Sequence, residues 1–87
     1  MLFMNIVTWE PEKRDEVLKR ALEEKVPEGI KVIGNWGDFS GRSFRLTETD
    51  DPTAMAQSAM YWNDVCEIEV IPVMEVTEEA LKSFAAQ

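Results

Sequence analysis

The chain has 87 residues and a net charge of −8, from nine Lys and Arg against seventeen Asp and Glu. This length predicts one domain with a modest core, and 45% hydrophobic residues indicate a folded rather than a disordered protein. The acidic balance without a basic cluster argues against nucleic acid as a partner, and the lack of a long apolar run argues against a membrane span.

The first strand and helix are predicted from alternation and helical spacing. Residues 2–9 alternate as a strand that is apolar on both faces, which predicts a central position in a sheet. A helix then begins at Pro11, because proline fits the first helical turn. Its predicted buried stripe consists of Val17, Leu18, Ala21, Leu22 and Val26.

Two further strands are predicted to form a hairpin. Residues 30–38 form the second strand, in which Gly34 and Gly37 indicate a sheet edge or a bulge. A loop with the positive φ that Gly41 allows leads into a third strand over 43–49. This strand has an apolar face and a polar face.

The second half of the chain opens with the clearest local signal. Asp51 followed by Pro52 is typical of a helix N-cap and first turn. A fourth strand over 65–74 contains Pro72, which indicates an edge strand because proline cannot donate to a ladder, and Thr77 is predicted to cap a short helix that ends near residue 85. The inner side of the second helix is predicted to carry Met55, Ala56, Ala59, Met60 and Trp62.

These elements predict an α+β fold with the order βαββαβ plus a C-terminal helix. Right-handed crossovers give a four-stranded antiparallel sheet of order 4-1-3-2 with both main helices on one face. The helix-covered face is predicted to carry Leu2, Met4, Ile6, Ile30, Val32, Phe44, Leu46, Cys66, Ile68 and Val70. The open face is predicted to carry Phe3, Asn5, Val7, Trp9, Ile33, Asn35, Phe39, Arg45, Thr47, Glu67, Glu69 and Ile71.

An open face with so many apolar groups predicts a partner, and a second copy is the simplest one. We therefore expect a homodimer that packs sheet against sheet. Its interface is predicted to centre on Phe3, Val7, Trp9, Arg45 and Ile71. The core is taken as residues 1–74 and the C-terminal extension as 75–87.

Several stretches carry a resemblance to a known family, namely Met1–Met4, Pro27–Lys31, Trp36, Thr49–Pro52 and Trp62–Val73. They resemble domain-of-unknown-function family 3303, and the likeness runs to about Met74. This family in turn resembles the dimeric α+β barrel superfamily of ferredoxin-like domains. That superfamily includes cofactorless quinone-forming monooxygenases, haem-degrading monooxygenases, muconolactone isomerase and stress-responsive barrel proteins. The resemblance implies a ferredoxin-like fold and a dimeric barrel, whereas the histidine ligand of the haem-degrading members has no counterpart here.

The chain has no histidine and a single cysteine, Cys66. This composition removes Ser-His and Cys-His nucleophilic pairs and histidine-based metal or haem ligation, and it excludes an internal disulfide. Cys66 is interpreted as a buried, inert thiol in a strand. We expect no cofactor, no metal and, because no signal peptide is recognised, a cytoplasmic location.

Two functions are left open by the sequence. The first is a small-ligand-binding or interaction module, with polar groups among apolar walls as in typical pockets. Its candidate ligand-binding residues are Asn5, Trp9, Asn35, Trp36, Phe39, Arg45, Thr47 and Glu69. For these residues a dimer interface is the better interpretation, because interfaces also collect aromatic and Arg residues. The second is a cofactor-independent oxygenase or isomerase acting on a small aromatic or carbonyl compound. There Asp38, Glu48, Glu67 or Glu69 would be the base, and Arg42 or Arg45 would polarise the substrate.

Overall fold

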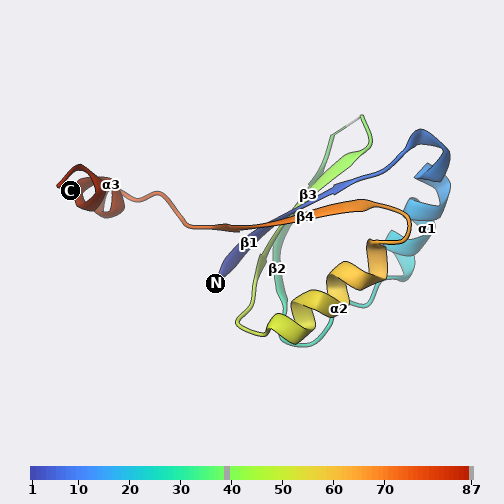
Figure 1. Ribbon diagram of the computed structural model, residues 1–87, viewed down its shortest axis with the longest axis horizontal. Coiled ribbons are helices and arrows are strands. Elements are labelled where there is room, and N and C mark those ends of the chain that lie inside the picture. Colours follow the sequence, from blue (N-terminus) through green and yellow to red (C-terminus); the bar gives the residue numbers. More distant parts are fainter. Residues whose placement is uncertain (39, 87) are drawn as a thin grey trace.

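The computed structural model describes residues 1–38 and 40–86. The elements are β1 (Leu2–Thr8), the 3₁₀ turn η1 (Pro11–Lys13), α1 (Arg14–Glu23), β2 (Lys31–Gly37), β3 (Arg42–Glu48), α2 (Pro52–Trp62), β4 (Glu67–Val73) and α3 (Glu78–Ala85). All strand pairs are antiparallel, and the sheet order β2-β3-β1-β4 confirms the prediction. Helices α1 and α2 lie on the same side of the sheet, while α3 stands apart (Figure 1).

The turns and caps form where the local sequence predicts them. The Asp51 carboxylate accepts hydrogen bonds from the backbone N–H groups of Thr53 and Ala54, at 3.0 and 3.2 Å, and so caps α2. Gly41 has φ of 95°, as the β2–β3 hairpin requires. Edge strand β2 has a register shift between Val32 and Gly34, and the Trp36 ring lies on Gly34.

The predicted orientation of β1 and β3 is wrong. Their odd-numbered side chains lie under the helices and not on the open face: Arg45 hydrogen-bonds to Glu24 just after α1, and Phe3 shares a surface hollow with Met55 of α2. The open face instead carries the even-numbered apolar residues. They are Leu2, Met4 and Ile6 of β1 and Phe44 and Leu46 of β3, joined by Trp36 and Ile71 of the edge strands.

Polar pairing explains this reversal. β1 is apolar on both faces, so its hydrophobicity does not select the buried one. In β3 the polar face is the buried one, because Arg45 is paired with Glu24 and Thr47 accepts a hydrogen bond from Asn5. A buried polar group is tolerated when it has such a partner. The orientation predicted for β4 agrees with the structure, since Ile68 lines a pocket under the helices.

The helices bury fewer of their apolar side chains than predicted. Val17 of α1 and Ala54 and Trp62 of α2 are the buried hydrophobic residues among those described. Leu22 is 89% exposed and Met60 is 69% exposed, so both point to solvent rather than into the core. Further predictions for these stripes are wrong, because Leu18, Ala21 and Ala56 are exposed and Val26 lies beyond the end of α1.

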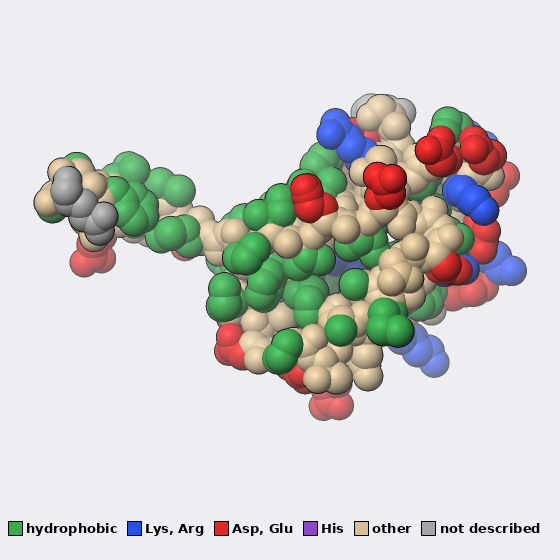
Figure 2. All heavy atoms as spheres, in the orientation of Figure 1, with side chains coloured by type: hydrophobic (Ala, Val, Ile, Leu, Met, Phe, Trp, Pro, Cys, Tyr) green, Lys and Arg blue, Asp and Glu red, His purple; other side chains and the backbone are tan. Residues whose placement is uncertain are grey.

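A separate arm continues from β4 through residues 74–77 into α3. Thr77 caps this helix by accepting a hydrogen bond from Ala80 N–H at 3.0 Å, as predicted. Leu81 and Phe84 are both more than half exposed, and the arm carries Met74 and Val76 exposed as well. Figure 2 shows hydrophobic side chains along the arm and on the adjoining part of the sheet.

Candidate functional site

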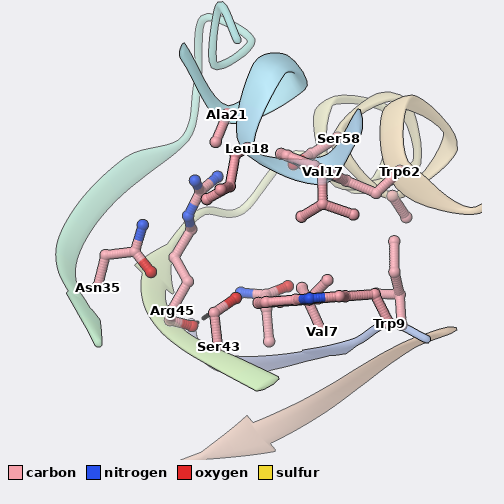
Figure 3. A pocket seen from close by; sticks show the side chains of 13 residues that line it. Val7, Trp9, Val17, Leu18, Ala21, Asn35, Ser43, Arg45, Ser58 and Trp62 are labelled. Atoms are coloured by element: carbon pink, nitrogen blue, oxygen red, sulfur yellow. Dashed lines mark hydrogen bonds between the residues drawn. The ribbon is translucent and has the colours of Figure 1, made fainter. Parts of the chain in front are cut away.

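A partly enclosed pocket of about 190 Å³ lies between the helices and the sheet (Figure 3). α1 and α2 form its roof, and β1, β3 and the two edge strands form its floor and sides. Its lining is mostly apolar, with Val7, Trp9, Val17, Leu18, Ala21, Ala59, Trp62 and Ile68 beside the polar Asn5, Asn35, Ser43, Arg45 and Ser58. An apolar cavity with a few polar groups is the usual form of a small-molecule site.

One wall of the pocket is fixed by an ion pair between Arg45 and Glu24. The Arg45 side chain rises from β3 toward the helix layer (Figure 3), where its two terminal nitrogens donate to the Glu24 carboxylate at 2.9 and 2.6 Å. Trp62 of α2 donates its indole N–H to the same carboxylate at 3.0 Å. The two side chains of the pair are 18% and 6% exposed, so it is largely shielded from water. Glu24 therefore joins β3 to both helices.

The Glu24 carboxyl group stays ionised in this setting. Burial alone would raise its pKa, but hydrogen bonds from Arg45 and Trp62 and the charge of Arg45 together lower the pKa below the ordinary value of 4.5. A carboxylate held in this way is a weak proton acceptor at neutral pH. It acts as a fixed counter-charge for Arg45.

Asn5 is held in the pocket floor by β3. Its side-chain amide donates to the backbone oxygen of Arg45 at 3.1 Å and to the Thr47 hydroxyl at 2.9 Å. Thr47 is only 3% exposed, so this bond satisfies a buried hydroxyl. The two contacts orient Asn5 and fix the floor of the site.

The roof is clamped where α1 meets the end of α2. Arg20 donates to both carboxylate oxygens of Asp64, at 2.6 and 2.8 Å, and to the backbone oxygen of Tyr61 at 2.9 Å. The Tyr61 hydroxyl donates back to the Arg20 backbone oxygen at 2.8 Å. This reciprocal pairing sets the spacing between the two helices above the pocket.

A second, shallower hollow of about 410 Å³ lies beside the first. Trp9 and Leu18 line both hollows and so separate them. Asp38 lines the second hollow and accepts hydrogen bonds from the backbone N–H groups of Ser40 and Arg42. These bonds, with the Arg42 guanidinium, lower the pKa of Asp38 to about 2. Asp38 therefore holds the hairpin loop and is a poor base.

The predicted ligand-binding residues do not all meet in one place. Asn5, Trp9, Asn35 and Arg45 line the pocket, and Thr47 supports its floor. Trp36 and Glu69 lie on the opposite face of the sheet, and Phe39 lies outside the described residues. Of the predicted interface residues, Ile71 is on the open face, whereas Phe3, Val7, Trp9 and Arg45 lie under the helices.

The remaining predicted bases are also away from the pocket. Glu48 and Glu67 are exposed, at the ends of strands that form the open face. Cys66, predicted to be buried in a strand, is half-buried and lies just before β4, and burial raises the pKa of its thiol. Within the described part of the chain, no group of three or more Cys, Asp or Glu side chains is arranged to hold a metal ion.

Sequence reasoning missed the contributions of the helices to the pocket and the role of Glu24. Ser58 lies one helical turn from both Ala54 and Trp62, a spacing that places it on the inner face of α2. The register also places Ser43 two residues from Arg45 on the same face. Glu24 gave no local signal, because it pairs with a residue 21 positions away. Such a pair is visible only once α1 lies over β3.

Comparisons with known proteins identify the family but no activity. The model of the family described as Domain of unknown function (DUF3303) matches residues 1–86, and the chain belongs to this family. No curated protein matches the chain. Among solved structures, a DUF3240 family protein from Shewanella baltica OS155 has a TM-score of 0.41 and 12% sequence identity, over 87% of this chain and 93% of that one. No helix in the described part of the chain has the length and apolar character to cross a membrane.

Proposed function

We propose that this member of the DUF3303 family is a small-ligand-binding module whose site is the pocket between the two main helices and the sheet. The observation that carries the proposal is the pocket itself, an apolar space of about 190 Å³ bordered by a rigid Arg45–Glu24–Trp62 group. An apolar cavity of about 150 Å³ already admits benzene. A compound with one aromatic ring and a polar group therefore fits the available space.

Binding is better supported than catalysis by the side chains around the pocket. Among the described residues that line it, none is an Asp, Glu, Cys, Lys or Tyr. An oxygenase or isomerase that removes a proton from its substrate needs a proton acceptor within hydrogen-bond reach. The predicted bases lie elsewhere, and the Glu24 carboxylate has a lowered rather than a raised pKa.

The proposal includes a homodimer, through the open face of the sheet. That face carries apolar side chains from all four strands, with Trp36 56% exposed and Ile71 37% exposed. Pairing two such faces would remove this apolar surface from water and leave the ligand pocket of each subunit on the outer side of its own sheet.

A pair of neighbouring substitutions in α2 tests the binding site. Ala59 lines the pocket, whereas the next residue, Met60, is 69% exposed on the outer side of the same helix. We expect Ala59→Phe to fill the pocket and weaken binding of one-ring aromatic compounds at least about ten-fold, and Met60→Phe to leave it unchanged. Ligand-observed NMR with charged and neutral one-ring aromatic compounds measures the binding of each compound to both variants. Equal binding by the two variants would place the ligand elsewhere and overturn the proposal.

A further inference from the structure

The charge of Arg45 is already matched inside the protein. Both terminal nitrogens of its guanidinium donate to Glu24, and the indole of Trp62 donates to the same carboxylate. At 6% exposure Glu24 is the more deeply buried partner, so its negative charge stays beside Arg45 whether or not a ligand is present. The wall of the pocket is therefore polar but close to electrically neutral.

An anionic ligand would bind weakly beside the Arg45–Glu24 pair. A second carboxylate near Arg45 would stand close to the Glu24 carboxylate, and like charges in a shielded site repel strongly. The chain as a whole adds an unfavourable field, because its net charge is −8. A neutral ligand avoids both costs.

The other polar groups of the pocket suit an uncharged ligand. Asn35, Ser43 and Ser58 line the pocket, and no hydrogen bond among the described residues engages their side chains. An amide and two hydroxyls both donate and accept hydrogen bonds. They match a carbonyl, amide or hydroxyl group and need no charge on the ligand.

We infer that the ligand of this pocket is an uncharged compound with an apolar ring and one carbonyl, amide or hydroxyl group, and that Glu24 excludes anions by neutralising Arg45. This inference rests on the proposed ligand-binding function. It assigns Glu24 a role in specificity, although Glu24 does not line the pocket itself. Trp62 contributes by fixing the carboxylate in place.

A matched pair of probes tests the inference. 4-Ethylbenzamide and 4-ethylbenzoate have nearly the same shape and differ in charge at pH 7. We expect the wild-type protein to bind the amide at least about ten-fold more tightly than the carboxylate, measured by ligand-observed NMR or calorimetry. This affinity ratio is measured on the wild-type protein alone. It therefore tests the inference even if a substitution at Glu24 prevents folding.

The variant Glu24→Gln removes the counter-charge and keeps the side-chain shape. Arg45 then carries an unmatched positive charge, so the benzoate should gain affinity and the ten-fold preference should shrink or reverse. Glu23→Gln is the control, because Glu23 is the exposed neighbour and its substitution changes the net charge equally. This control should keep the wild-type ratio.

The outcomes separate the inference from the proposed function. Tighter binding of the benzoate by the wild-type protein, or an unchanged ratio in a folded Glu24→Gln protein, overturns the inference and leaves the binding function standing. If neither probe binds at millimolar concentration, or if Ala59→Phe binds both as the wild type does, the proposed function and the inference both fail.

Discussion

Glu24 joins the helix layer to the sheet. Its carboxylate accepts from Arg45 of β3 and from Trp62 of α2, while Glu24 itself follows the last residue of α1. Three elements thus meet at one side chain that is nearly inaccessible to water. Breaking a buried pair costs more than the pair contributes, because the remaining charge is left without a partner.

We expect Glu24→Gln to lower the free energy of unfolding by about 1 to 3 kcal/mol at pH 7. The pKa of Glu24 is lowered in the folded protein, so its charge stabilises the fold above the ordinary value of 4.5. This stabilisation is lost as the pH falls through the lowered value. The difference between wild type and variant should therefore be constant near neutrality and disappear in acid. Urea unfolding across this pH range measures it.

The exposed neighbour supplies the control for this experiment. Glu23→Gln should change the free energy of unfolding by less than about 0.5 kcal/mol at every pH, as is usual for a surface site. A Glu24→Gln protein that loses no stability at pH 7, or one whose deficit persists in acid, would show that the pair does not hold the layers together.

Four of the eight ligand-binding candidates that the sequence offers line the pocket, and the reason is local. Asn5, Trp9, Asn35 and Arg45 are polar or aromatic residues in strands, and their types alone made them candidates. Glu24 looked like one more charge on an acidic helix. The partner of Glu24, Arg45, is 21 residues away in the sequence, so the local sequence around Glu24 does not indicate the pair.

At the scale of elements, α2 depends on its first turn. The Asp51 side chain caps two backbone N–H groups, and a Cβ added at Gly29, which has φ of 97°, would contact the same aspartate. Ala54 of this first turn is 3% exposed, so the cap positions a buried residue of the core. The start of α2 is thus tied to the loop that precedes β2.

We expect Asp51→Ala to lower the free energy of unfolding by about 1 kcal/mol, the usual effect of removing an N-cap. Asp50→Ala is the control, because Asp50 is an exposed carboxylate next to the cap and pairs only with the terminal amine among the described residues. It should change stability clearly less than Asp51→Ala does, because a fully exposed ion pair contributes little. Denaturant titration of both variants gives the comparison, and equal losses would argue against the cap.

Element order and sheet order were predictable, whereas the orientation of β1 and β3 and the side on which Asn35 of β2 lies were not. Pro72 and Gly34 correctly marked the edges, because proline and glycine fit poorly in a central ladder. Orientation depends on which face is buried, and β1 offers apolar side chains on both. In β3 the apolar face was expected to be the buried one. This expectation is wrong, because the Arg45 and Thr47 side chains have polar partners under the helices.

At the scale of the whole molecule, two apolar surfaces lack a partner within the described chain. One is the open face of the sheet, and the other is the inner stripe of α3, where Leu81 and Phe84 are more than half exposed. An eight-residue helix is marginal on its own, so α3 gains stability only by packing on something. In the proposed homodimer, a second copy of the chain would supply a surface for each.

We expect the protein to be a dimer, with a mass by light scattering after size exclusion of about twice the 10.0 kDa of the chain. Leu46→Lys places a charge in the open face, which should favour the monomer because burying an unpaired lysine is unfavourable. Leu22→Lys is the control, since Leu22 is 89% exposed on α1, away from that face. A wild-type monomer at micromolar concentration, or an equal loss of dimer in both variants, would mean that the open face is not the interface. In that case α3 folding back over its own sheet becomes the better explanation.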